Sequence, residues 1–96
     1  MYCVSSELYD EVAARLCDAI GSGAYFSGTI EFPHADVACR LTASLLFYRR
    51  REVWPEGERS CITDVIPVWW EFHTVMPEGE VLNDFSFSEL KRWLTV

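Results

Sequence analysis

The spacing of apolar residues predicts a helix first and strands afterwards. Between residues 5 and 23, in "SSELYDEVAARLCDAIGSG", Leu8, Val12 and Leu16 recur every four residues. This spacing is typical of a helix that buries one face. Ser5 or Ser6 can cap its start, and the glycine after Ile20 can end it. From residue 24 to residue 75 the period changes to two and aromatic and β-branched residues become frequent, which predicts strands.

Three strands are expected, over residues 25–32, 36–54 and 59–76. The connectors are "PHAD", which begins at Pro33, and "PEGE", which begins at Pro55. Proline has the backbone dihedral that the second position of a turn requires. We therefore predict a three-stranded antiparallel meander. The letters PEGE recur at residues 77–80, and there we expect them to lead the third strand out towards a last helix.

The last helix is predicted over "DFSFSELKRWL", residues 84–94. Ser86 with Glu89 three residues later matches a capping box, in which each residue satisfies a backbone N–H near the start of the helix. The predicted element order is α-β-β-β-α. Because both helices need an apolar surface to cover, we expect an α+β fold of one domain, residues 1–96, as a two-layer α/β sandwich with both helices on one sheet face.

The two turns also predict how the strands pair. If Phe32 lies opposite Val37 and Trp54 lies opposite Arg59, one face of the sheet is almost entirely apolar. On the third strand that face includes Ile62, Ile66, Val68, Trp70 and Phe72, and Asp64 is its single polar member. Pro67 cannot donate a hydrogen bond to a neighbouring strand, so we expect the third strand to be an edge strand with a bend or bulge at residues 64–67.

The opposite face of the sheet is polar and aromatic, and no helix remains to cover it. In the predicted pairing Arg40 lies between Thr29 and His73, with Glu31 and Glu71 on its diagonals. Tryptophan, tyrosine and arginine are common anchors of protein interfaces. The candidate interaction surface therefore consists of Tyr25, Arg40, Tyr48, Trp69, Glu71 and His73.

Three interpretations of this face compete. It can be a solvated sheet with ordinary cross-strand pairs. It can be an interaction surface, used for example by a homodimer that stacks its sheets or pairs the edge of the third strand. It can also hold a small-ligand or hydrolytic site around His73, Glu71 and Arg40, since a histidine beside a carboxylate can transfer protons.

The composition narrows the classes of partner. The formal charge of −7 at pH 7 argues against a nucleic-acid-binding protein, whose affinity comes largely from lysine and arginine. We expect the "RRR" triplet at Arg49, Arg50 and Arg51 to be a solvated strand end paired with nearby glutamates. The acidity also leaves open that the protein inhibits a basic partner.

The order α-β-β-β-α resembles that of the double-stranded RNA-binding domain. In that family the second helix presents lysines to phosphate at its N-terminus. The corresponding segment here, "SFSEL" from Ser86 to Leu90, carries an acid in that place. The resemblance is limited to element order, and we do not expect RNA binding.

The sequence contains no catalytic or cofactor motif. The four cysteines lack the spacing of a metal site, so we expect buried, reduced thiols and neither metal nor cofactor. No signal peptide or membrane-spanning segment is recognised, which favours a soluble cytoplasmic protein. The main expectation is a non-enzymatic interaction or regulatory domain that forms a homodimer or binds another protein.

Overall fold

The structure is a computed structural model that describes residues 1–95, including only the backbone of Arg59. Two helices and four strands follow one another in the order α1 (Ser6–Ile20), β1 (Tyr25–His34), β2 (Val37–Trp54), β3 (Gly57–Met76), β4 (Gly79–Val81) and α2 (Phe87–Leu94). The strands form one antiparallel sheet in the order β1-β2-β3-β4. The predicted α+β class with an antiparallel sheet is confirmed.

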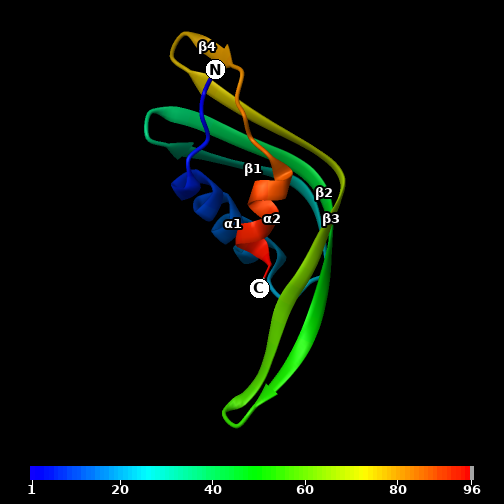
Figure 1. Ribbon diagram of the computed structural model, residues 1–96. Helices are drawn as coiled ribbons and strands as arrows, with labels where there is room; N and C mark the ends of the chain where they lie inside the picture. The colour runs from blue at the N-terminus through cyan, green and yellow to red at the C-terminus, as the bar shows by residue number, and fades with distance from the viewer. Residues whose placement is uncertain (96) are drawn as a thin grey trace.

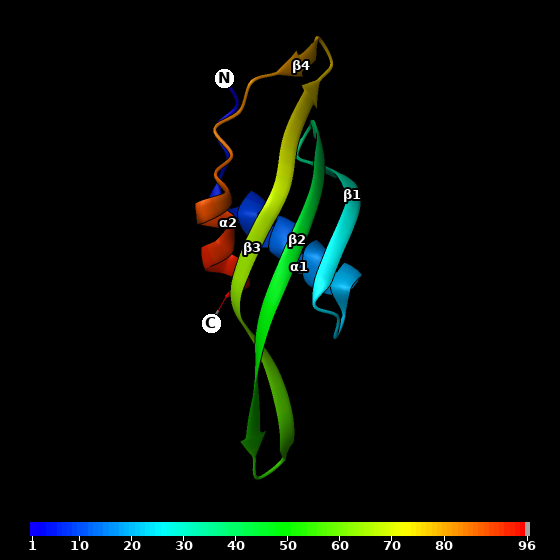
Figure 2. The same ribbon diagram turned by 90° about the vertical axis from the view of Figure 1, so that its right-hand side faces the viewer.

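The sheet is long and bent, and both helices lie on its concave side (Figure 1). Figure 2 shows α1 crossing behind β1, β2 and β3, with α2 beside it behind the margin of β3. The molecule measures 53 × 24 × 19 Å, because the hairpin of β2 and β3 projects beyond the helices as a two-stranded ribbon. The convex side of the sheet carries no helix.

The prediction of three strands was wrong. The second PEGE segment forms a tight hairpin in which Met76 pairs with Gly79, as Trp54 pairs with Gly57 at the first. Gly57 and Gly79 have φ values of 142° and 130°, which favour glycine, so the two segments have one structural role. The element order is α-β-β-β-β-α, and the resemblance to the double-stranded RNA-binding domain does not extend to it.

The turn between β1 and β2 is shorter than predicted. Pro33 belongs to β1, and only Ala35 and Asp36 connect the strands, with Ala35 at a φ of 49°. As a result Phe32 pairs with Cys39 and not with Val37. This shift is two residues long, so every side chain of β1 keeps the sheet face that the sequence predicted.

Two irregularities interrupt the pairing of β2 with β3. Trp54 lies opposite Gly57 and not Arg59, and one extra residue enters β3 between Ile62 and Asp64 and another between Pro67 and Trp69. Between these bulges the alternation of β3 is reversed. Val65 is fully buried, whereas Ile66 and Val68 are exposed, so the predicted place of Ile66 and Val68 on the apolar face was wrong. The predicted bend at residues 64–67 is confirmed.

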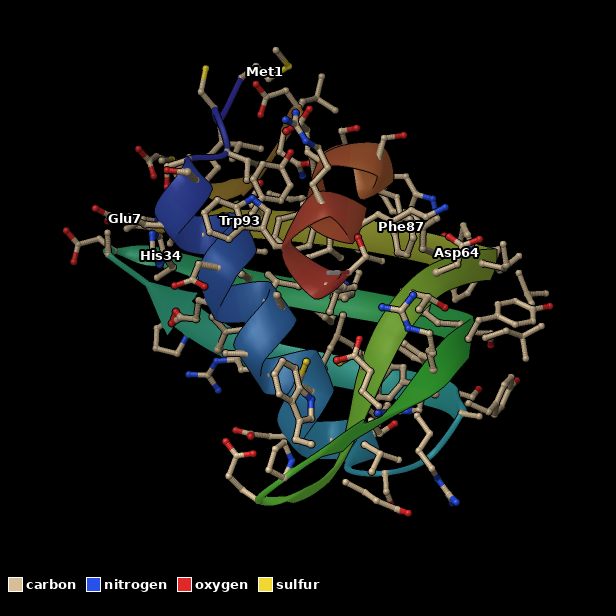
Figure 3. All side chains as sticks on the ribbon, turned by 60° about the horizontal axis from the view of Figure 1, so that its bottom comes forward. Met1, Glu7, His34, Asp64, Phe87 and Trp93 are labelled. Atoms are coloured by element: carbon tan, nitrogen blue, oxygen red, sulfur yellow. The ribbon has the colours of Figure 1, made fainter. Side chains whose placement is uncertain are left out.

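Asp64, the polar residue that did not fit the predicted apolar face, lies at the first of these bulges. Its carboxylate pairs with Lys91 of α2 and accepts a hydrogen bond from the backbone N–H of Val65. These contacts lower the pKa of Asp64, with Lys91 as the main cause. Figure 3 shows Asp64 on β3 beside α2. β3 is not the edge strand that the sequence predicted, because β4 pairs with its last residues, but within the described residues the stretch around Asp64 has no strand on the side away from β2. The bulge there allows a polar residue to hold the second helix.

The core fills the space between the helices and the concave face. Leu8, Val12 and Leu16 of α1 are fully buried, as are Leu41 and Leu45 of β2. The segment before α2 adds an aromatic cluster centred on Phe85, whose ring contacts those of Tyr9, Trp70 and Phe72. The alternation of β2 and the spacing of α1 thus both lead into one apolar layer.

The start of α2 is capped differently from the prediction. Ser86 is the N-cap residue, but its hydroxyl makes no capping hydrogen bond. Its backbone N–H donates to the hydroxyl of Tyr9 at 2.9 Å, and Glu89 pairs with Arg92. The hydroxyl of Tyr9 therefore takes the acceptor role that the capping box assigns to Glu89. At α1 the predicted cap is confirmed, since Ser5 accepts a hydrogen bond from Leu8.

The three arginines of the "RRR" triplet have two different roles. Arg50 pairs with Glu52 at 2.7 Å and Arg51 with Glu58 at 3.6 Å, as predicted. Arg49 instead donates from Nε to the carbonyl oxygen of Gly23 and from Nη2 to that of Gly21, at 2.8 and 2.9 Å. A cation is favourable there because carbonyl groups at the end of a helix lack partners and carry partial negative charge.

Replacing Arg49 with alanine is expected to lower the free energy of unfolding by about 1–2 kcal/mol, because two charge-assisted hydrogen bonds to the end of α1 are lost. Urea denaturation followed by circular dichroism measures this change. Arg50→Ala is the control, and it is expected to change stability by less than about 0.5 kcal/mol because its pair with Glu52 is exposed. Equal effects of the two substitutions would contradict the capping role.

Candidate functional site on the convex face

The convex face is ordered in rows, each made of directly paired residues of β1, β2 and β3. One row contains Glu31, Arg40 and His73, and the next contains Thr29, Thr42 and Glu71. Towards the bend of the sheet come the row of Ser27, Ser44 and Trp69 and then the row of Tyr25, Leu46 and Ile66. The face is thus charged towards the β1–β2 turn and apolar towards the bend.

At the bend of the sheet, exposed apolar side chains gather into what we call the convex patch, which consists of Tyr25, Leu46, Tyr48, Ile66, Val68 and Trp69. The two tyrosines expose 56% and 55% of their surface, Trp69 48% and Val68 66%. Since a large aromatic side chain covers 150–250 Å², the convex patch exposes roughly 600 Å². A patch of this size is at the upper end of what monomeric proteins expose and often has a function.

Farther along the same face, His73 is held between two carboxylates. Its Nε2 lies 3.0 Å from Glu71 Oε2, and its Nδ1 lies 2.7 Å from Glu80 Oε1, which belongs to β4. The hydrogen bonds to Glu71 and Glu80 raise the pKa of His73 above 6.5, although partial burial and the charge of Arg40 act in the opposite direction. The two carboxylates therefore stabilise the imidazolium form relative to the neutral ring, and the contact with Glu80 ties β4 to β3.

This arrangement bears on the hydrolytic interpretation. A histidine that acts as a general base needs a free ring nitrogen towards its substrate, and both nitrogens of His73 already have carboxylate partners. The contacts of His73 thus favour a structural role.

Within residues 1–95, no three side chains of His, Cys, Asp or Glu are placed to hold a metal ion.

The His73 bridge predicts a pH dependence. Because the pKa of His73 is raised on folding, its stabilisation is complete below about pH 6.5 and is lost as the pH rises through the folded pKa. The loss is expected to be about 0.2–1 kcal/mol, as for other exposed ion pairs. An NMR titration should show a lower pKa of His73 in Glu80→Gln than in the wild type. Glu78→Gln, in the same turn, is the control, and an unchanged titration in Glu80→Gln would contradict the bridge.

The structure places the six predicted surface residues on the convex face in two separate groups. Tyr25, Tyr48 and Trp69 belong to the convex patch, and Arg40, Glu71 and His73 belong to the charged rows. The predicted position of Arg40 between Thr29 and His73 was wrong, because Glu31 occupies the position opposite it.

Sequence reasoning missed several members of both groups. Ile66 and Val68 were assigned to the buried face, and only the misfit of Asp64 together with Pro67 gave a sign of the bulges that turn them outwards. Glu80 was missed because β4 was not predicted. Leu46 lies on the same face as Tyr48 by alternation along β2, but it was not counted among the candidate residues.

The cysteines correct another expectation. All four are free, but only Cys39 is buried, while Cys3 and Cys17 are exposed and Cys61 is partly buried. Burial raises the pKa of Cys39 to about 11, so its thiol is protonated and unreactive in the folded protein.

Neither α1 nor α2 has the length and apolar character that a helix needs to cross a membrane.

Comparisons of the chain with protein-family models, curated proteins and solved structures gave no match.

Proposed function

We propose that the protein is a small, non-enzymatic association domain that forms a homodimer by packing the convex patches of two copies together. The observation that carries this proposal is the row of Tyr25, Leu46 and Ile66, in which three apolar side chains lie directly across three strands and face solvent. Trp69 and Tyr48 extend it on either side. Aromatic residues at the centre of an exposed apolar surface are the usual anchors of protein interfaces.

The size of the convex patch sets the expected strength of the dimer. Two copies that each cover about 600 Å² would bury about 1,200 Å² in total, which is the lower limit for specific interfaces. The curvature of the sheet further restricts the area in contact, because two convex surfaces touch mainly at their bends. We therefore expect a reversible dimer with a dissociation constant on the order of micromolar.

The edge of β3, which the sequence also suggested as a dimer contact, is less suited to this role. Its last residues, from Thr74 to Met76, pair with β4. The remainder carries Pro67 and two bulges, which are features that keep the edges of sheets from pairing with other chains. The convex face has no comparable protection.

Light scattering of the wild type and of Trp69→Ala tests the proposal. The wild type is expected to show a mass that rises towards the dimer with concentration, and Trp69→Ala is expected to weaken association about 30-fold, as for an interface anchor worth about 2 kcal/mol. Trp93→Ala is a matched control, because Trp93 on α2 is exposed by 45% and lies outside the convex patch. A monomer at all concentrations, or equal effects of the two substitutions, would contradict the proposal.

Salt dependence separates this proposal from the alternative that the acidic protein inhibits a basic partner. An apolar contact is little affected by salt, whereas binding through the net charge of −7 weakens as the Debye length falls from about 14 Å at 50 mM salt towards about 4 Å at 500 mM salt. Dimerisation that persists at high salt supports the convex patch. Loss of the dimer at high salt would contradict an apolar contact, whereas binding to a basic protein that weakens steeply over the same range would support the alternative.

A further inference from the structure

A small hollow lies on the convex face near the β1–β2 turn, well away from the convex patch. Its floor is the row of Pro33, Ala38 and Val75, which are paired across the three strands. Because Ala38 is the smallest of the three, the surface sinks between its neighbours, and the hollow has a volume of about 460 Å³. This volume lies within the range of sites that bind small molecules.

Two charged residues stand at one side of this hollow. Glu31 and Arg40 both line it, and they lie directly opposite each other on β1 and β2. Opposite charges in this position usually form an ion pair. Within the described part of the chain, however, neither side chain has an ion pair or hydrogen bond, whereas Arg50 and Arg51 of the ribbon both have glutamate partners.

The rows on either side of Arg40 explain why it has no other carboxylate partner, since Glu71 lies in one of them and Glu80 lies at the β4 end of the other. Glu71 and Glu80 are the nearest acids on β3 and β4, and both are held by His73. The guanidinium of Arg40 is thus available to donate hydrogen bonds beside the apolar floor of the hollow. The carboxylate of Glu31, directly opposite it on β1, is available to accept them. One cationic and one anionic group are available above a surface that suits an aliphatic side chain.

We propose that this hollow binds a small zwitterion with an apolar side chain, that is, a free aliphatic amino acid. Its carboxylate would accept hydrogen bonds from the guanidinium of Arg40, and its ammonium would donate to Glu31. Its side chain would cover Ala38 between Pro33 and Val75. A simple anion would be repelled by Glu31 and a simple cation by Arg40, so the pair of charges selects a ligand that carries both. The inference does not depend on the dimer.

NMR titration with L-leucine tests this site. Saturable shifts of the backbone amides of Ala38, Arg40 and Val75 are expected, with a dissociation constant of about 1 mM or below, as for a ligand of this size. N-acetyl-L-leucinamide, which has the same side chain without the charges, is expected to bind at least about tenfold more weakly.

Two substitutions separate the charge from the hollow. Arg40→Gln is expected to weaken binding of L-leucine about tenfold, and Ala38→Leu is expected to abolish it by filling the floor. Arg50→Gln, on the same side of β2 but in the ribbon, is the control and should bind like the wild type. The absence of saturable shifts up to 10 mM L-leucine, or equal binding by Arg40→Gln and the wild type, would overturn the proposal. Dimerisation of Ala38→Leu is expected to be normal, so failure here and failure of the convex patch can be told apart.

Discussion

Replacing Phe85 with alanine is expected to lower the free energy of unfolding by about 3–5 kcal/mol, as for other large aromatic residues of a core. Phe85 stands before α2 and is 92% buried, since only 8% of its surface is exposed. Its ring stacks on Phe72 of β3 at 4.2 Å and also contacts Tyr9 of α1 and Trp70. The substitution therefore removes the contacts that the segment before α2 makes with both α1 and the sheet.

Chemical denaturation of Phe85→Ala and Phe26→Ala provides the measurement. Phe26 of β1 is only partly buried at the margin of the core, so its loss is expected to have a clearly smaller effect. If Phe85→Ala does not fold, Phe85→Leu keeps the test available, with an expected loss of about 1–2 kcal/mol. An effect of Phe85→Leu no larger than that of Phe26→Leu would contradict the central place of this ring.

A glutamate in place of Leu46 is expected to have the largest effect on association. Leu46 lies at the centre of the convex patch, between Tyr25 and Ile66. Burying an unpaired carboxylate there would cost several kcal/mol, so the dimer should weaken by more than about 100-fold. The fold should persist, because the side chain of Leu46 is already 38% exposed and points away from the core.

Analytical ultracentrifugation of Leu46→Glu against Val53→Glu measures this effect. Val53 is an apolar residue of the ribbon with 77% of its surface exposed, so it controls for the added charge. Circular dichroism should show both variants folded. If Val53→Glu loses the dimer and Leu46→Glu retains it, the association surface is the ribbon and the proposed role of the convex patch is wrong.

The two sheet faces could be predicted largely from the sequence, even though the pairing of β1 with β2 was not. The prediction placed Phe32 opposite Val37, and the structure places it opposite Cys39. Because side chains alternate with a period of two, an error of two residues leaves each one on its own face. The alternation of polar and apolar residues was therefore enough to predict the two faces. Which residues lie opposite each other depends on the length of the turn, which alternation does not reveal.

The bulges limited the prediction on β3. Residues 62–70 contain apolar side chains at almost every position, so alternation could not show where an extra residue enters. Val65 and Ile66 are of similar character, and which of them is buried depends on the bulge beside Asp64 and its contact with Lys91. Two of the six residues of the convex patch, Ile66 and Val68, were hidden for this reason.

The surroundings of His73 in the charged rows could not be predicted for a different reason. β4 has only three residues and follows a turn that the sequence could equally use as an exit from the sheet. Without β4, Glu80 could not be placed beside His73, and the one-sided pair of His73 with Glu71 resembled a catalytic arrangement. With Glu80 on the second nitrogen, the same histidine becomes a bridge between strands.

A dilution series followed by amide NMR tests whether the convex patches of two copies pack together, because it locates the association surface without any substitution. The resonances of Tyr25, Leu46, Ile66 and Trp69 are expected to shift as the concentration falls from about 1 mM to about 10 μM, on the scale of a micromolar dissociation constant, while those of α1 and α2 stay constant. Spectra that do not change with concentration, or changes confined to the helices or the ribbon, would contradict it.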